Sequence, residues 1–379
     1  MEPIRILQVV TIMNRGGLET MLMNYYRQMD RTKIQFDFMV HRDERGDYDE
    51  EIERLGGKTY RMPHIRPGNY KNYFTLLEEF FDSHTEYKVV HSHINENSSF
   101  VLKAAHKAGI PCRIAHSHCS GLGVDYKFPF RLYARFTMKN HPTNYLACST
   151  KAGEWLFGKN VKKPREVTVF NNAINVNDFV YDSNVRKKIR AEFNAEDKLV
   201  LGHVGRFNKS KNHDFLLNIF KAVHNKQPNS MLVLVGDGDL RSSIEKKATR
   251  LGLKSHVLFL GVREDINELM QGFDLFIFPS LFEGLPVVLV EAQAAGLNCI
   301  IADSITSEVD ITGRIKFLSL RESSDAWAQT ILSSAYEHVN TSEMIRKTGY
   351  DISSMANWLS GYYMVHALNV VQAQEEVLS

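Results

Sequence analysis

The sequence predicts an α/β protein with two Rossmann-like domains, each built on a doubly wound parallel sheet. Short runs of Val, Ile and Leu alternate with helix-length amphipathic stretches along the chain, as is typical of parallel sheets covered on both faces. The runs form two series, separated at 171–190 by a polar, asparagine-rich stretch with no strand pattern. At 379 residues the chain is long enough for two domains, because one core rarely grows beyond roughly 250–300 residues.

The order of the runs gives the domain boundaries. The first series consists of IRILQVV, IQFDFMV, KVVHSH, CRIAHSH, NYLACS and VTVF. The second consists of LVLGHVG, MLVLVG, VLFLG, DLFIFPS and NCIIA. We therefore expect an N-terminal domain over 1–175 and a C-terminal domain over 176–351. A last helical segment, 352–379, carries aromatic residues at helical spacing, and we expect it to pack back on the first domain.

Composition and charge limit the class of protein. The chain is 44% hydrophobic and 24% charged, with a net charge of +2, which is ordinary for a soluble globular protein. Between Lys103 and Arg165, however, twelve Lys and Arg residues stand against two acidic residues. Such a stretch favours an anionic partner, either a membrane surface or a phosphorylated substrate. Nucleic acid is not expected, because no nucleic-acid-binding module is recognised.

The sequence also indicates the compartment. A charge at Arg5 within the first apolar run argues against a signal peptide. No stretch approaches the roughly 20 apolar residues that span a bilayer. The four cysteines have no close metal-type spacing, which fits a reducing environment. We therefore expect a cytoplasmic protein.

The most informative segment is 278–296, FPSLFEGLPVVLVEAQAAG, which reads as the end of a strand, a tight turn and a helix. Pro286 can begin the helix, because its missing N–H is not needed in a first turn. The free amides of that turn attract phosphate oxygens, and Gly284 lets a ligand approach the backbone. Glu283 and Glu291 flank the turn and suit sugar hydroxyls better than phosphate. The segment predicts a site for a sugar joined to a phosphate.

Two further motifs directly follow predicted strands. Gly16 and Gly17, in NRGGLE, could bring the backbone close to an anion or form an ordinary strand-to-helix turn, and they do not complete a GxGxxG fingerprint. Arg206 and Lys211, in GRFNKSKN, could hold a diphosphate as a fork and a point charge, or lie in a solvated loop. Since ligands bind at the carboxyl ends of parallel strands, we expect the two sheets to face one ligand across a central cleft.

Candidate metal ligands occur in two places. His91-Ser92-His93 and His116-Ser117-His118 each end a predicted strand, and alternating residues share a face. No third ligand stands at a convincing spacing, so ordinary strand-end histidines, or one histidine of the second pair acting on a sugar, are the preferred interpretations. Asp237-Gly238-Asp239 has the DxD spacing of another class of sugar transferase, but Asp-Gly is typical of a turn. We predict no metal and no other cofactor.

A basic, aromatic segment lies in the first domain. KFPFRLYARFTMK, at 127–139, interleaves four aromatic residues with basic ones. On a helix this pattern could place the aromatics in the interface of an anionic membrane. Packing of the same aromatics in the core, beneath a solvated basic face, is equally compatible with it.

Taken together, the motifs resemble those of the retaining GT-B glycosyltransferases of family 4, and are similar in particular to bacterial capsular and exopolysaccharide transferases. The resemblance covers nearly the whole chain. It rests on the order of the early Gly-Gly turn, RIAHSH, NNAIN at 171–175, Gly205-Arg206 with Lys211-Asn212, and Glu283 with Glu291. The chain departs from the family pattern at Ala173 and Asn175, where Gly and Asp are usual, and at Lys88, which replaces a customary Asp.

The resemblance implies a nucleotide sugar, UDP-linked, bound mainly by the second domain. Arg206 and Lys211 would hold its diphosphate, Glu291 its ribose diol, and the backbone of Val262 and Arg263 its base. The Glu283 carboxylate would hold a hydroxyl of the donor sugar, and the amides of Gly284 and Leu285 would hold the distal phosphate. His118 would lie near the donor sugar and the reaction centre. Gly16 and Gly17 would close over the phosphates from the first domain.

The activity implied is metal-independent transfer, with retention, to a glycan or lipid-linked saccharide in bacterial surface-polysaccharide synthesis. The residues expected to act on the reacting groups are His118, Glu283, Arg206 and Lys211. No carboxylate is placed as a nucleophile, so same-face attack assisted by the leaving phosphate is the expected mechanism. Alternatives are a GT-B nucleotide-sugar epimerase or hydrolase, and a non-catalytic sugar-binding protein. The protein would work in the cytoplasm, with or without peripheral contact with the inner face of the cell membrane.

Overall fold

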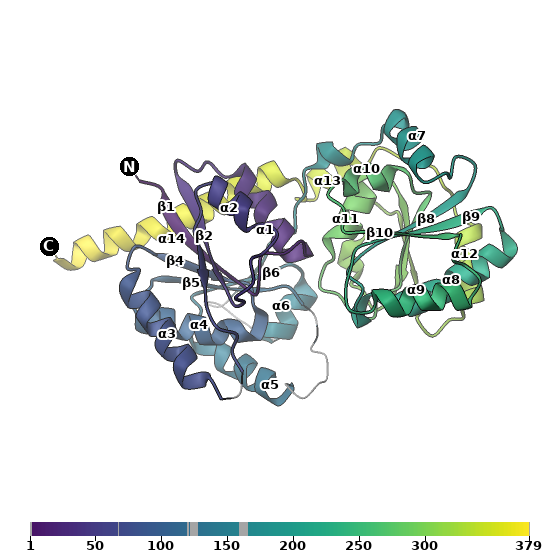
Figure 1. Cartoon of the computed structure of the whole chain (residues 1–379). Helices are drawn as coiled ribbons and strands as arrows, with labels where there is room; N and C mark the ends of the chain where they lie inside the picture. The colour runs from purple at the N-terminus through teal and green to yellow at the C-terminus, as the bar shows by residue number, and fades with distance from the viewer. Residues whose placement is uncertain (1, 67, 120, 122–127, 159–165, 379) are drawn as a thin grey trace. The chain divides into compact units, whose positions relative to one another are not determined.

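The computed structural model describes residues 2–66, 68–119, 121, 128–158 and 166–378. The chain folds into two compact α/β units (Figure 1). Unit 1 comprises the chain up to Ala173 together with the segment from Ile352 onward, and unit 2 comprises Ile174–Asp351.

Unit 1 is built on a parallel sheet. Its described strands follow the order β3-β2-β1-β4-β5-β6-β7. They are β1 Ile4–Val10, β2 Ile34–Val40, β3 Thr59–Arg61, β4 Val89–Ser92, β5 Cys112–Ser117, β6 Asn144–Ala147 and β7 Val167–Val169. The order reverses between β1 and β4, and a doubly wound sheet leaves a crevice at such a reversal, at the carboxyl ends of its strands.

Helices cover both faces of this sheet (Figure 1). One face carries α1 Gly17–Gln28, α2 Asp49–Arg54 and α14 Ile352–Leu378. The other carries α3 Tyr70–Ser83, α4 Ser98–Lys107, α5 Phe128–Thr137 and α6 Thr150–Phe157. In β1, Ile6 belongs to the first core and Leu7 to the second. This burial on both faces explains why the strand reads as a continuous apolar run.

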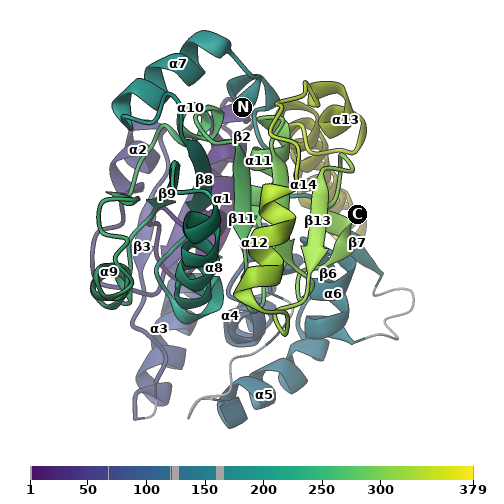
Figure 2. The same ribbon diagram turned by 90° about the vertical axis from the view of Figure 1, so that its right-hand side faces the viewer.

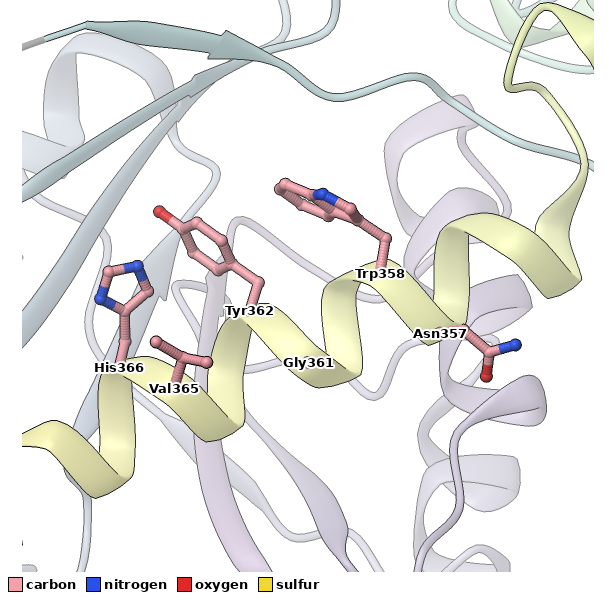
Figure 3. A pocket seen from close by; sticks show the side chains of 6 residues that line it. All are labelled: Asn357, Trp358, Gly361, Tyr362, Val365 and His366. Carbon is pink, nitrogen blue, oxygen red and sulfur yellow. The ribbon is translucent and has the colours of Figure 1, made fainter.

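Helix α14 returns the end of the chain to unit 1. Tyr363 is fully buried, and its ring meets Phe36 of β2 edge-on at 5.9 Å. A second side of α14 carries Trp358, Tyr362 and His366, which line a shallow hollow (Figure 3). Their neighbouring ring centroids lie 5.0 and 4.4 Å apart. Trp358 also contacts Phe170, which follows β7, with ring centroids 5.3 Å apart, so aromatic packing on two sides attaches this distant segment to unit 1.

Unit 2 repeats the arrangement. Its described strands follow the order β10-β9-β8-β11-β12-β13, with a reversal between β8 and β11. They are β8 Leu199–Val204, β9 Ser230–Val235, β10 Val257–Gly261, β11 Leu275–Phe278, β12 Asn298–Ala302 and β13 Ile315–Leu318. Position 202 of β8 has to be glycine, because a Cβ there would overlap the Phe273 ring.

Helices also lie on both sides of the unit 2 sheet. One core is formed with α8 His213–Lys226, α9 Arg241–Arg250 and α12 Ser324–Leu332, and Figure 2 shows α8 and α12 on the near face of the sheet, roughly along its strands. The opposite side carries α7 Ser183–Glu192, α10 Ile266–Gln271, α11 Val287–Ala294 and α13 Ser342–Lys347. The predicted pair of doubly wound parallel sheets is confirmed. In the described residues, no helix combines the length and apolar character needed to cross a bilayer.

Candidate functional site

The loops after β8 and β11 meet at the reversal in the unit 2 sheet. The Asn212 side-chain amide donates to the Pro279 carbonyl at 3.1 Å, and the Leu281 amide donates to the Ser210 carbonyl at 2.7 Å. These bonds join two segments about 70 residues apart into one surface at the carboxyl ends of the strands.

Lys211 and Glu283 form an ion pair on this surface. Lys211 Nζ lies 2.6 Å from Glu283 Oε1, and the two side chains are only 16% and 14% exposed. The same Nζ lies 4.8 Å from the centroid of the Phe278 ring. The Lys211 stem passes over Gly205, where a Cβ would come within 3.2 Å of it. The structure thus fixes a cation in a largely desolvated place, where its field acts more strongly than in water.

Arg206 is placed differently from Lys211. It follows Gly205 directly in the loop after β8, and its side chain is exposed. Among the described residues its guanidinium has no ion-pair or hydrogen-bond partner. A guanidinium with no internal partner keeps its donors available for an external anion.

Glu291 lies in the second turn of α11. The helix begins at Val287, one residue later than the sequence suggested, because Pro286 has an extended ψ of 118° and is the N-cap. The Glu291 side chain is partly buried, and its carboxylate has no hydrogen-bond or ion-pair partner among the described residues. Burial raises the pKa of Glu291 to about 7. A buried carboxylate of this kind is well suited to accept hydrogen bonds from a ligand that brings its own donors.

The remaining unit 2 candidates lie at other strand ends. Val262, directly after β10, is 55% exposed. The Arg263 side chain is engaged by Asp265 and Glu192, with Nε 2.8 Å from Asp265 Oδ1 and Nη1 3.0 Å from Glu192 Oε1. That side chain is occupied, so any contact with a nucleobase would come from the backbone, as the resemblance implies. In the turn before α11, the two candidates Gly284 and Leu285 are buried.

The Asp237–Asp239 segment is a turn after β9. Asp237 Oδ1 accepts a 2.7 Å hydrogen bond from the Gly238 amide, and a Cβ at Gly238 would come within 2.7 Å of the Phe207 carbonyl. Gly238 has a φ of +153°, which side-chain-bearing residues rarely adopt. In the part of the chain that the structure describes, these aspartates belong to no cluster of metal-type ligands.

In unit 1, the predicted glycine turn opens α1. Gly16 is the N-cap, with φ −108° and ψ 167°, and α1 begins at Gly17. The Glu19 carboxylate folds back against Gly16, where only a residue without a Cβ leaves room for it. A carboxylate in the first turn is stabilised by the helix dipole. Closure of Gly16 and Gly17 over a phosphate remains a prediction.

The four strand-end histidines form one cluster at the other reversal. Because β4 and β5 are neighbouring parallel strands, His91 Nε2 lies 3.1 Å from His116 Nδ1, and His93 Nδ1 lies 2.9 Å from His118 Nε2. Desolvation lowers the pKa of all four rings, so they are neutral at pH 7.

The histidine cluster also corrects the sequence-based view of metal ligands. No third ligand was expected from the spacing within each pair, but the structure brings His91, His93 and His116 together, with ligand atoms within 4.8 Å of one another. The third ligand comes from the neighbouring strand, which the linear spacing could not reveal. Most nitrogens of these rings already form hydrogen bonds with one another or with other protein groups, and a metal ion would have to replace those bonds. The absence of a metal remains a prediction.

Sequence analysis missed several buried polar residues beside these clusters. Gln8 of β1 and Tyr363 of α14 bind the histidines of unit 1. In unit 2, His203 and His213 lie beneath the Lys211 loop, and His213 stacks on Phe207 with centroids 4.0 Å apart. Gln8 and His203 stand inside apolar strand runs, where a single polar residue gives no sequence signal of its own.

Known protein families match both halves of this chain. The model for Glycosyl transferases group 1 matches residues 185–351, and that for Glycosyltransferase Family 4 matches residues 15–178. EpsF of Bacillus subtilis, a protein assigned as a glycosyltransferase, is 40% identical over 371 residues, which cover 95% of this chain and 96% of EpsF. The capsular polysaccharide biosynthesis glycosyltransferase CapH of Staphylococcus aureus is 25% identical over 96% of this chain and 100% of CapH.

A solved structure has the same fold. HepE of Anabaena, crystallised with UDP and glucose, superposes with a TM-score of 0.78 over 96% of this chain and 100% of HepE. At 17% identity this likeness establishes the GT-B fold.

We predict that Glu291 makes folding stability depend on pH. The unfolded chain has the ordinary pKa of 4.5 at this carboxyl and the folded chain about 7. Between these values the folded state binds more protons, so the free energy of unfolding falls as pH rises through that window. Glu291→Gln should therefore stabilise the ligand-free protein by about 3 kcal/mol more at about pH 8 than at about pH 4.

Urea unfolding across this pH range measures the effect. The exposed Glu322→Gln is the matched control, and its difference from wild type should not change with pH. A Glu291→Gln protein whose advantage is the same at both ends of the range would contradict the assignment.

Proposed function

This chain belongs to the GT-B glycosyltransferases of bacterial exopolysaccharide and capsule synthesis, and we propose that it is a retaining, metal-independent enzyme with a UDP-sugar donor. The group moved would be a hexose or N-acetylhexosamine, and the acceptor a glycan or lipid-linked saccharide. The observation that carries this proposal is the charge arrangement after β8 and β11: a fixed Lys211–Glu283 pair, an exposed Arg206 guanidinium without a partner among the described residues, and a partly buried Glu291.

Donor binding follows from these charges. The Arg206 fork and the Lys211 ammonium would hold the diphosphate, and Glu291 would accept hydrogen bonds from the two ribose hydroxyls. The backbone at Val262 and Arg263 would meet the base. The UDP bound in the similarly folded HepE supports this choice of nucleotide.

The bond that breaks joins the anomeric carbon to the diphosphate oxygen, and negative charge develops on the departing UDP. Lys211 is held by Glu283 before any ligand binds, so little reorganisation is needed when that charge appears. With Arg206 it would supply the charge that a metal ion supplies in other enzymes. Glu283 would also accept a hydrogen bond from a donor-sugar hydroxyl.

The acceptor hydroxyl would attack the same face that the diphosphate leaves, and its proton would pass to a leaving phosphate oxygen. The amides of Gly284 and Leu285 would hold the distal phosphate, and His118 of unit 1 would lie beside the donor sugar. Gly16 and Gly17 would approach the phosphates from the same unit. Exclusion of water by this closure would suppress hydrolysis of the donor.

A lipid-linked acceptor would require contact with a membrane, and α5 is suited to it. Phe130 points inward and stacks on Phe100 at 5.4 Å and on Tyr70 at 5.5 Å. Tyr133 and Phe136 are 59% and 73% exposed. The helix thus combines both interpretations of its sequence, because one aromatic ring packs inward and two are exposed. We propose that the exposed pair enters the interface of an anionic bilayer.

We predict that Arg206→Ala weakens UDP binding about 10- to 100-fold, because a charge-assisted contact with the diphosphate is lost. Glu291→Ala should weaken it about tenfold, since the ribose hydroxyls lose their acceptor. Titration calorimetry in EDTA measures both and tests metal independence at once. Arg250→Ala is the control, because this exposed side chain lies at the last residue of α9 and outside the proposed site. Wild-type affinity in both test variants would contradict the site.

We predict that His118→Gln lowers kcat about 100-fold while UDP affinity stays close to wild type, because the residue is proposed to act at the reacting sugar rather than on the nucleotide. Acceptor-dependent release of UDP from a panel of UDP-sugars measures the rate. Full turnover in His118→Gln would remove it from the reaction centre, and UDP release that ignores the acceptor would favour a hydrolase.

We predict that Tyr133→Ser combined with Phe136→Ser lowers binding to phosphatidylglycerol vesicles about tenfold, because both exposed rings are removed from the interface. Vesicle co-sedimentation measures the change. Phe282→Ser, at an exposed aromatic in unit 2, is the control. Equal vesicle binding by the double variant and wild type would show that α5 is not the anchor.

A further inference from the structure

We propose that a chain of hydrogen bonds from Tyr363 through Gln8 and His93 holds His118 in one tautomer, with the proton on Nε2 and Nδ1 bare. The inference deepens the proposed function and rests on it, because the proposed function places His118 at the reaction centre. It makes Tyr363, Gln8 and His93 positioning residues for that side chain.

The chain lies at the reversal of the unit 1 sheet. Gln8 of β1 is aligned with His91 of the neighbouring β4, and Tyr363 reaches both from α14. Gln8, His91, His93 and Tyr363 are each at most 1% exposed, whereas His118 is partly exposed. Buried polar groups must satisfy one another, so the orientation of each donor restricts the next.

Tyr363 sets the direction of the chain. Its Oη lies 2.6 Å from His91 Nδ1. This separation is usual when a hydroxyl donates and shorter than usual when a ring N–H does, so the phenol gives its only proton to His91. Tyr363 can then only accept from Gln8, whose Nε2 lies 3.1 Å from the phenol oxygen. The amide nitrogen of Gln8 therefore faces Tyr363.

Gln8 in turn sets the tautomers of His93 and His118. Its Oε1, which can only accept, lies 2.9 Å from His93 Nε2, so that nitrogen carries the proton. A neutral imidazole has one N–H, which leaves His93 Nδ1 bare. His118 Nε2 lies 2.9 Å from this atom and must donate to it. His118 Nδ1 is consequently bare, and it has no hydrogen-bond partner among the described residues.

The other arm of the chain ends at His116. With Nδ1 accepting from Tyr363, His91 donates from Nε2 to His116 Nδ1 at 3.1 Å. The proton of His116 is then on Nε2, a buried atom without a partner in the described part of the chain. Among the described residues, the donor without a partner is thus on His116, and the open acceptor is on His118.

A bare Nδ1 restricts what His118 can do. It can accept a hydrogen bond from a sugar hydroxyl, and it cannot donate a proton to the leaving phosphate through that atom. The structure therefore assigns His118 to recognition of a hydroxyl group rather than to protonation of UDP.

The test measures tautomers in the ligand-free full-length protein. Nitrogen NMR of ¹⁵N-histidine-labelled protein distinguishes protonated from bare ring nitrogens, and His118→Gln assigns the signals of His118. In wild type we expect Nε2 protonated and Nδ1 bare. In Tyr363→Phe, and independently in Gln8→Met, both tautomers of His118 should appear. Tyr25→Phe is the matched control, because it removes another buried hydroxyl of unit 1, one that donates to the Asn171 carbonyl.

Activity gives a second readout. Tyr363→Phe should lower kcat about tenfold with the donor KM within about twofold, while Tyr25→Phe changes neither. A proton on Nδ1 in wild type, a tautomer unchanged in both variants, or zinc bound stoichiometrically to the histidines would overturn the inference. A fixed tautomer together with full turnover in His118→Gln would support the inference and contradict the proposed role of His118 instead.

Discussion

Parallel strand pairing with a single reversal of order is the constraint on which both clusters depend. In each unit, helices leave the strands in opposite directions on either side of the reversal, so the carboxyl ends there are not covered by a crossover. The strands are buried and their register is fixed, as in the pairing of Gln8 with His91. Side chains far apart in sequence are thereby held at hydrogen-bond distance: Lys211 and Glu283 are 72 residues apart, and His91 and Tyr363 are 272 apart.

The two clusters handle buried polarity in opposite ways. In unit 2, Lys211 is compensated by Glu283, whereas Arg206 and Glu291 keep their binding capacity for something outside the chain. In the described part of unit 1, neutral histidines bind one another, and in the proposed tautomer His118 keeps an open acceptor. In the proposed site, the charged residues of unit 2 would bind the diphosphate. The neutral histidines of unit 1 would form hydrogen bonds with the less polar sugar. Each cluster gives up some folding stability, which the rest of a well-packed sheet can supply.

Much of the fold could be predicted from the sequence, because buried parallel strands leave continuous apolar runs that survive without any tertiary information. The positions of Arg206, Glu283 and His118 could also be predicted, since each directly follows such a run. The ion pair between Lys211 and Glu283 could not, because it depends on which strands are neighbours. The role of Tyr363 was hidden for the same reason: its spacing shows only that it faces a core, not that its hydroxyl meets a histidine.

The return of α14 to unit 1 has a consequence for biosynthesis. A ribosome releases unit 2 as one continuous stretch, Ile174–Asp351, so this half can complete its core during translation. Unit 1 must wait, because Tyr363 and the apolar side of α14 follow the whole of unit 2 in the chain. Until then the face that α14 covers stays open to chaperones and aggregation. The histidine cluster of unit 1 is thus completed only after unit 2 has been synthesised, because Tyr363 binds His91.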